Sequence, residues 1–273
     1  MDFTFGIVTG GGYDERIREI ILSIEELKIP NYEVLVVGPT SVRGRNITTI
    51  PFDETVKRAW ITRKKNLITN QARYENIVYL HDYIIFDRNW YQGFLDFGND
   101  FDAVMCRMNN FDGTRYRDWC LWSRNHAIID WVVYPNRTLI SYDLTEVKSH
   151  LYFSGAFWVA KKSFMENCPL NEDLVAGQAE DVEWSKRAQE FSQLKLNNFS
   201  MVNLLKTNLV VAQEPGKFRM WLISKFLTNS LIDVDMLYKK IPSCLEVLLY
   251  RQLQGASKVS VRLKMFMRRL KRN

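Results

Sequence analysis

The carboxylates that follow apolar segments are the residues of this sequence best suited to catalysis. Asp82 comes directly after a short apolar run and lies between His81 and Tyr83. Much later in the chain, Glu180 and Asp181 are adjacent at the start of a predicted helix. A carboxylate at a strand end can bind a divalent cation, and a member of an adjacent pair can act as a general base. Each also has a structural alternative, because Asp caps turns and acidic residues stabilise helix N-termini.

A run of three glycines offers a different chemistry, the binding of a phosphate or nucleotide. Gly10, Gly11 and Gly12 follow an apolar strand and precede an amphipathic helix, where backbone N–H groups can approach an anion. A dinucleotide site also needs an acidic residue at the end of the second strand. Residues 37–40 read VGPT there, which disfavours NAD. The alternative is a tight turn that binds no ligand.

The elements that must position these residues follow an α/β pattern. Apolar strands are predicted at residues 3–9, 33–37, 47–52 and 77–80, and amphipathic helices at 14–28 and 62–73. Their order predicts a mostly parallel sheet that is covered by helices on both faces. Ligands of such sheets bind at the carboxyl ends of the strands. The residues expected at those ends are Thr9, Gly10, Gly38, Asp53 and Asp82.

Charge divides the chain into two parts. Residues 217–273 contain thirteen Lys and Arg against three acidic residues, a net charge of +10. Because the whole chain carries +6, the remainder carries −4. We expect one domain at residues 1–215, with an aromatic-rich segment at about 109–150, and a basic helical C-terminal extension at 216–273.

Taken in order, these motifs resemble those of GT-A-fold glycosyltransferases of the family 2 type across roughly residues 3–212. The opening strand and turn, FTFGIVTGGGYDERIREIILSI, and the second strand, YEVLVVG, are similar to the start of that fold. ITRKKNLITNQARYENIVYLHDY resembles the helix and strand that lead to the family's D-x-D motif. SGAFWVAKK resembles the strand beside the acceptor site, and AEDVEWSKR resembles the E-D base motif.

The resemblance implies a GT-A fold, Rossmann-like, with a mostly parallel mixed sheet, helices on both faces and a C-terminal helical extension. It implies a hexosyltransferase-like enzyme that moves a sugar with inversion from a UDP-, GDP- or dTDP-sugar to a glycan or lipid-linked acceptor. Asp181 would be the general base, and Glu180 is the second choice because the register is uncertain by one residue. Gly155 would border the acceptor. The residues implied to bind the donor are Thr9, Gly10, Gly11, Asp53, Lys64, Lys65, Asn66, His81 and Asp82. For the two lysines, the alternative is a solvated helix face.

The resemblance is weakest at the metal site. The family's D-x-D motif aligns with His81-Asp82-Tyr83, so only the middle position is acidic. Asp82 would bind Mn²⁺ or Mg²⁺ together with the donor diphosphate, alone or with His126 or His150 as a second ligand. The alternative is an enzyme that works without metal, or one that does not work at all.

The aromatic-rich segment has two interpretations. Trp119 and Trp122 could stack on sugar rings at the acceptor site, together with Tyr116 and Trp131, while Arg115 and Arg117 reach an anionic acceptor. Equally, these side chains could form the core of an inserted subdomain.

Two other function classes stay open at this point. A degenerate family member would bind a nucleotide-sugar without transferring it, as the change around Asp82 suggests. A sugar nucleotidyltransferase would need a basic loop after the first strand, whereas this loop continues into Asp14 and Glu15.

Cysteine spacing indicates an intracellular protein. Cys106, Cys120, Cys168 and Cys244 are widely spaced without a C-x-x-C pair, which favours reduced thiols over zinc ligands or disulfides. The N-terminus lacks the pattern of a signal peptide, and no apolar run is long enough to span a bilayer. We therefore expect a cytoplasmic protein that can also lie on the cytoplasmic face of a membrane.

The C-terminal extension has the pattern of a basic amphipathic helix. Between residues 258 and 272, an apolar stripe at helical spacing is surrounded by Lys and Arg, which fits an anionic membrane surface. The alternative is a helix that packs on its own domain. No nucleic-acid module accompanies the charge, so nucleic acid is not an expected partner.

Membrane binding by the extension predicts that the full chain pellets with anionic liposomes, whereas a chain truncated near Gly255 stays in the supernatant. The physical reason is that truncation removes both the apolar stripe and its basic flanks. Co-sedimentation measures the difference, and neutral liposomes are the control. Equal pelleting of the two chains would support packing on the domain instead.

Overall fold

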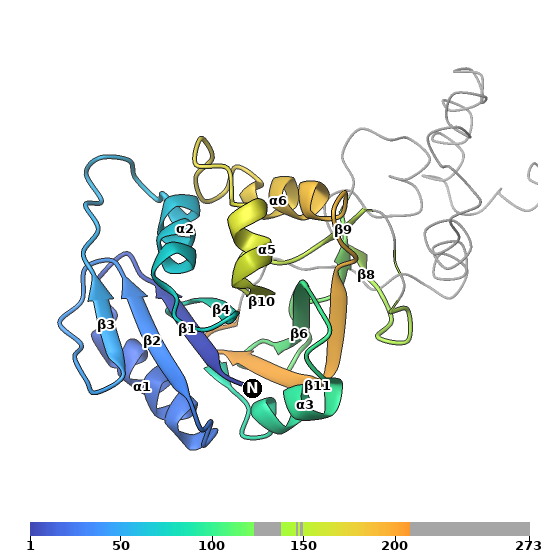
Figure 1. Cartoon of the computed structure of the whole chain (residues 1–273), viewed down its shortest axis with the longest axis horizontal. Coiled ribbons are helices and arrows are strands. Elements are labelled where there is room, and N and C mark those ends of the chain that lie inside the picture. Colours follow the sequence, from blue (N-terminus) through green and yellow to red (C-terminus); the bar gives the residue numbers. More distant parts are fainter. Residues whose placement is uncertain (123–137, 146, 148–149, 208–273) are drawn as a thin grey trace, which may run out of the picture.

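The computed structural model describes residues 1–122, 138–145, 147 and 150–207, and its largest element is an eight-stranded sheet (Figure 1). The strands of this sheet are β1 (Phe3–Val8), β2 (Tyr32–Val37), β3 (Ile47–Ile50), β4 (Asn76–His81), β5 (Ile84–Phe86), β6 (Ala103–Asn109), β10 (Phe157–Lys161) and β11 (Lys195–Leu204). The predicted extension at 216–273, and the boundary at residue 215, lie outside the described residues. No described helix has both the length and the apolar character needed to cross a membrane.

The sheet is mixed but mostly parallel, in the order β3-β2-β1-β4-β10-β6-β11-β5. Strands β3, β2, β1 and β4 run parallel, and Val8 of β1 pairs with both Val37 of β2 and His81 of β4. Strand β10 is antiparallel to β4 and β6, whereas β11 is parallel to β6 and antiparallel to β5. The predicted α/β class is therefore confirmed. Because β1, β2 and β4 end level, the residues that follow them share one edge of the sheet.

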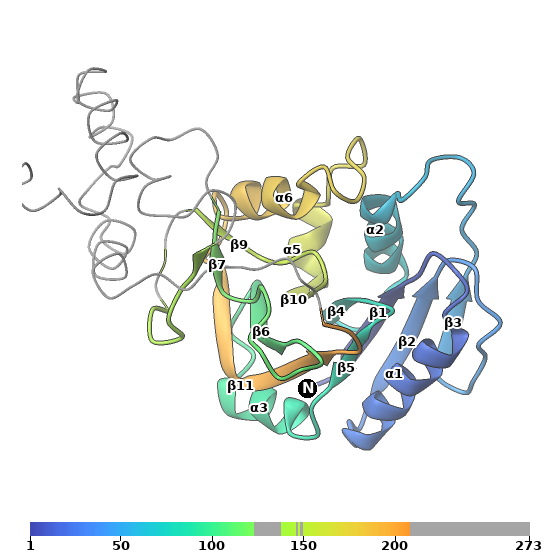
Figure 2. The same cartoon turned by 180° about the vertical axis from the view of Figure 1, so that it is seen from behind.

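Helices cover both faces of the sheet (Figures 1 and 2). They are α1 (Asp14–Glu26), α2 (Ile61–Gln71), α3 (Trp90–Phe97), α5 (Lys162–Asn167) and α6 (Glu180–Ala188). The alternation of side chains along β1 separates the two layers. Phe3 and Phe5 contact Trp90 of α3, with ring centroids 5.3 and 5.8 Å apart. A Cβ on Gly6 would instead meet Ile68 of α2, which lies on the opposite face.

Helix α1 buries the predicted apolar face but is shorter than predicted. Its residues Ile17, Ile20 and Ile24 are fully buried. The helix ends at Glu26 and not at Lys28, because Lys28 has a φ of 54°, which lies outside the right-handed helical region.

A second, three-stranded sheet lies in the aromatic-rich segment, in the order β8-β7-β9. Its strands are β7 (Cys120–Leu121), β8 (Thr138–Leu139) and β9 (Leu151–Tyr152). The buried carboxylate of Asp118 accepts hydrogen bonds from Arg115 Nε at 2.8 Å, from the Tyr142 hydroxyl at 2.5 Å and from the Met108 N–H at 3.1 Å. Because a buried charge needs such partners, this cluster holds the segment against β6. Arg115 therefore serves the fold, and its guanidinium is not free to reach an acceptor.

The close contact between α3 and β11 predicts that a larger residue at Gly93 destabilises the protein. A Cβ at Gly93 would lie 2.6 Å from the carbonyl carbon and oxygen of Phe199. We expect Gly93→Ala to lower the free energy of unfolding by about 1–3 kcal/mol, because backbone must move to relieve the overlap. Gly10→Ala is the control, since, among the described residues and apart from its chain neighbours, no atom lies within 4 Å of a Cβ added at Gly10. Urea denaturation measures both, and equal stability of the two variants would contradict the close packing.

Candidate active site

The level ends of β1 and β4 open onto a cavity of about 490 Å³. Thr9 and Gly10 follow β1, His81 ends β4 and Asp82 follows it, so the parallel register brings these four residues together. Lys64 reaches the same cavity from α2. All five were predicted beside a donor, and the structure places them around one space.

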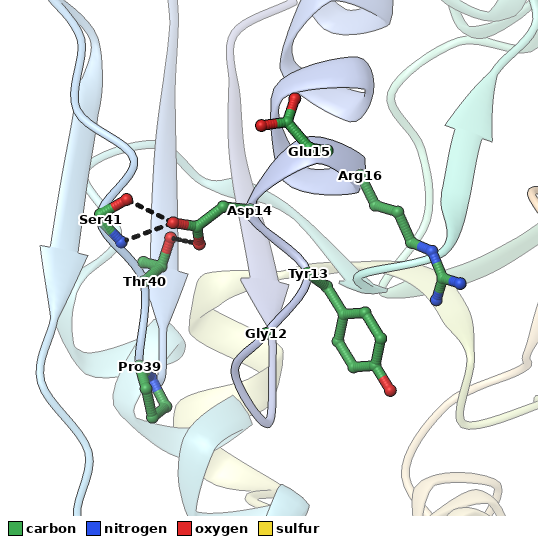
Figure 3. A pocket seen from close by; sticks show the side chains of 8 residues that line it. All are labelled: Gly12, Tyr13, Asp14, Glu15, Arg16, Pro39, Thr40 and Ser41. Carbon is green, nitrogen blue, oxygen red and sulfur yellow. Dashed lines mark hydrogen bonds between the residues drawn. The ribbon is translucent and has the colours of Figure 1, made fainter.

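The glycine run forms a tight turn between β1 and α1 (Figure 3). Gly11 and Gly12 have φ angles of 90° and 78°, a region that residues with a side chain rarely adopt. Asp14 then accepts hydrogen bonds from the Thr40 hydroxyl at 2.6 Å and from the Ser41 N–H at 3.1 Å. Hydrogen bonds from Ser41 and Thr40 lower the pKa of Asp14 to about 2. The start of α1 is thereby tied to the loop after β2.

A second cavity, of about 720 Å³, lies around this turn and reaches Pro39 (Figure 3). Tyr13 and Arg16 line both cavities, and the Arg16 guanidinium lies 4.7 Å from the centre of the Tyr13 ring. Figure 3 shows both side chains on the side of the turn away from Thr40 and Ser41. The two cavities therefore adjoin at the Tyr13–Arg16 pair.

The pKa values of Asp82 and His81 shift in opposite directions within the smaller cavity, and both shifts favour the neutral form. Burial raises the pKa of Asp82, while a hydrogen bond from Thr9 and the charge of Arg16 act against the increase. Burial and nearby cations such as Lys65 lower the pKa of His81 well below its usual value. The imidazole is therefore neutral at pH 7. Its Nε2 atom is buried without a hydrogen-bond partner among the described residues.

The two consecutive lysines of α2, Lys64 and Lys65, contact different parts of the site. Lys64 Nζ donates to the Thr9 carbonyl at 2.7 Å and pairs with the carboxylate of Glu54. Lys65 Nζ donates to the Gly155 carbonyl at 2.6 Å. Both side chains are buried, so the alternative of a solvated helix face is wrong.

Lys65 and the predicted base are joined through one glycine. The N–H of Gly155 donates to Asp181 Oδ2 at 2.9 Å, while its carbonyl accepts the bond from Lys65. The Lys65 ammonium also lies 4.0 Å from the centre of the Trp158 ring. Burial lowers the pKa of Lys65 to about 7, although Glu180 and Asp181 oppose this. Burial and then the charge of Asp181 raise the pKa of Glu180.

Four of the residues predicted beside the donor do not line the smaller cavity: Gly11, Asp53, Lys65 and Asn66. Asn66 donates to the Leu170 carbonyl at 2.9 Å, and it does not line the cavity. Asp53 is exposed and accepts hydrogen bonds from the N–H and hydroxyl of Thr55, which lower its pKa. Asn66 and Asp53 thus stabilise local structure in this conformation.

The two tryptophans predicted at the acceptor site have different surroundings. Trp119 is fully buried, and its indole N–H donates to the Leu144 carbonyl at 2.7 Å. This placement agrees with the core alternative, because a buried ring cannot stack on a sugar. Trp122 is half-buried beneath the Lys186 ammonium, 5.0 Å from its ring centre. Trp131 lies outside the described residues.

Three cations that line the smaller cavity are not predicted from the sequence. Arg16 comes from the first turn of α1, Arg58 from the loop before α2, and Lys206 from just after β11. Arg16 alone had a local signal, because it follows the glycine turn directly. The other two reach the cavity only through the tertiary fold.

Comparisons with known proteins identify the fold. No protein-family model and no curated protein sequence matches the chain. GalNAc-T7, crystallised with UDP, GalNAc and Mn²⁺, matches with a TM-score of 0.55 and 14% identity, over 79% of this chain and 45% of its own. S. aureus TarS 1–349, in complex with UDP-GlcNAc, matches with a TM-score of 0.50 and 12% identity, over 93% of this chain and 72% of its own. The chain therefore has the predicted GT-A glycosyltransferase fold, and it spans less than half the length of GalNAc-T7.

The contact network around Lys65 predicts a change in the titration of Glu180. Lys65→Met removes a cation that lowers the pKa of Glu180, so that pKa rises further, because the charged carboxylate loses a favourable interaction. Methionine keeps most of the buried volume beside Trp158. Carboxyl ¹³C NMR against pH measures the shift, with the Glu180 signal assigned through Glu180→Gln.

Lys28→Met is the control for this titration, because Lys28 is exposed after α1. An unchanged Glu180 titration in a folded Lys65→Met protein would contradict the coupling.

Proposed function

We propose that this chain is a glycosyltransferase that moves a sugar from a nucleotide-sugar donor to a glycan or lipid-linked acceptor with inversion. UDP-, GDP- and dTDP-sugars are the candidate donors. The observation that supports it most is the hydrogen bond from the Gly155 N–H to Asp181, which directs a carboxylate to the turn before β10, next to the end of β4. The GT-A fold makes this position relevant to sugar transfer.

The donor would lie along the carboxyl ends of β1 and β4. The turn at Gly10 and Gly11 would approach the nucleotide, and the cations lining the cavity would face the diphosphate. The sugar would then extend past Asp82 and His81 toward Gly155. A neutral His81 with an unpartnered Nε2 atom can exchange a hydrogen bond with a sugar hydroxyl or a phosphate oxygen.

Asp181 is the proposed general base. Its two oxygens accept from the N–H groups of Gly155 and Val182, each at 2.9 Å, which fixes the orientation of the carboxylate. It would take the proton of the acceptor hydroxyl as that oxygen attacks the anomeric carbon from the face opposite the diphosphate. Glu180, the adjacent carboxylate, is the second choice for this role.

The acceptor would approach from the side of the aromatic-rich segment. Trp122 is partly exposed there, beside the start of α6. Arg117 lies close enough to Asp181 for their charges to interact, and it donates to the Tyr116 hydroxyl at 2.6 Å. An aromatic face and a cation are suited to a sugar ring and to an anionic acceptor respectively. The basic C-terminal extension would hold the enzyme at a cytoplasmic membrane face.

A degenerate, binding-only member of the fold is the second candidate, since Asp82 is the only acidic residue of the His81-Asp82-Tyr83 segment. Such a protein would bind the donor through the same cavity and leave the sugar uncleaved. Donor hydrolysis separates the two functions.

Asp181→Asn tests the proposed function. Donors are first identified by the melting temperature of the full chain with UDP-, GDP- and dTDP-sugars, with and without Mn²⁺. We expect the variant to bind the stabilising donor normally and to hydrolyse it about 10²–10⁴-fold more slowly, because it has lost the base. Calorimetry and nucleotide release measure the two effects.

Glu183→Gln makes the same carboxyl-to-amide change on α6, where Glu183 pairs with Arg187, and it should keep the normal rate. Full activity of Asp181→Asn, or stabilisation by NAD(H) and by no sugar nucleotide, would contradict the proposed function.

A further inference from the structure

The smaller cavity carries an excess of positive charge. Glu54 is paired with Lys64, so these two charges cancel. Arg16, Arg58 and Lys206 remain, and no described carboxylate forms an ion pair with any of them. The remaining carboxylate in the lining is Asp82, which leaves a net charge of +2 facing the cavity. A cleft with this balance attracts anions and opposes the entry of a second cation.

The residues present do not fit a resident divalent cation. Mg²⁺ and Mn²⁺ prefer several oxygen ligands, and the described residues hold no group of three or more His, Cys, Asp or Glu side chains suited to a metal. Asp82 stands within the electrostatic reach of Arg16, Lys206 and Lys64. Its neighbour His81 is flanked by Lys206 and other cations.

The two predicted second ligands do not improve this fit. His126 lies outside the described residues. The carbonyl of His150 accepts from the Trp122 N–H at 2.8 Å, within the aromatic-rich segment, and His150 is not among the residues that line the cavity.

Two of the three unpaired cations are held in defined places. Arg16 lies over the Tyr13 ring at the junction of the two cavities. Lys206 Nζ lies 4.1 Å from the centre of the Tyr83 ring, and the backbone N–H of Leu205 donates to the Tyr83 carbonyl at 2.9 Å. The two cations come from opposite ends of the described chain, and both interact with the charge of Asp82.

We propose that Arg16 and Lys206 neutralise the diphosphate of the donor in this chain, in the role that a divalent cation would otherwise take. The proposal rests on the proposed function, since it names how the same site binds its donor. Guanidinium and ammonium groups both form charge-assisted hydrogen bonds with phosphate oxygens. The net charge of +2 offsets that of a diphosphate bridge, about −2 once it is esterified at both ends.

Calorimetry of the full chain with UDP, GDP and dTDP, in EDTA and in Mn²⁺, tests this assignment. For the nucleotide that binds, the dissociation constant in EDTA and the dissociation constant in Mn²⁺ should agree within about threefold. Arg16→Gln and Lys206→Gln should each weaken it about tenfold or more in EDTA, because each removes a charge-assisted hydrogen bond. Binding of the parent nucleoside, which has no phosphate, should be the same in all variants.

Arg18→Gln is the matched control. It removes the same charge from the same helix, but Arg18 pairs with Glu15 and does not line the cavity. We expect its affinity for the nucleotide to equal that of the unaltered chain. Arg16→Lys and Lys206→Arg should recover part of the lost affinity.

The outcomes separate this inference from the proposed function. Binding that is lost in EDTA and restored by Mn²⁺ would overturn the inference and leave the proposed function in place. If Arg16→Gln and Lys206→Gln bind the nucleotide as tightly as the unaltered chain, the inference is also overturned and the proposed function again stays in place. If none of the three nucleotides binds in either condition, the proposed function fails and the inference fails with it.

Discussion

The site depends on the contacts that stabilise the buried ammonium group of Lys65. A charge inside a protein is costly unless surrounding groups stabilise it. Here the Gly155 carbonyl, the Trp158 ring and the carboxylates of Glu180 and Asp181 do so together. These groups come from α2, from β10 and the turn before it, and from α6. Their geometry therefore cannot vary independently, and the proposed base keeps its position relative to the end of β4.

The strand register supplies the other half of the arrangement. Parallel pairing levels the ends of β1, β2 and β4, and residues at the ends of β1 and β4 line the smaller cavity. Insertion of antiparallel β10 beside β4 then brings the Gly155 turn to that same end, where the backbone N–H of His81 donates to the Ala156 carbonyl at 3.1 Å. The proposed donor side and the proposed base side are thus adjacent because antiparallel β10 lies between the parallel strands β4 and β6.

Local pattern was sufficient to predict the first half of the fold but only part of the site. Period and turn residues predicted β1, α1, β2 and β4, because these elements bury regular apolar faces. The same reasoning could not show that Lys64 and Lys65 are buried, since Lys is normally a surface residue of a helix. It could not separate Trp119 from Trp122 either, because burial there depends on the Asp118 cluster. Lys206 follows a strand at the far end of the domain, and nothing near it in the sequence marks a ligand.

Helix α2 has a consequence for how this chain can change during evolution. Its consecutive residues Lys64, Lys65 and Asn66 serve three separate places: the cavity wall, the carboxylate pair and the loop at Leu170. Each step along a helix rotates the side chain by about 100°. An insertion or deletion of one residue in this helix would therefore misdirect all three at once. Substitutions on its exposed last turn, at Asn70 and Gln71, carry no such penalty, so relatives of this chain should vary there while α2 keeps its length.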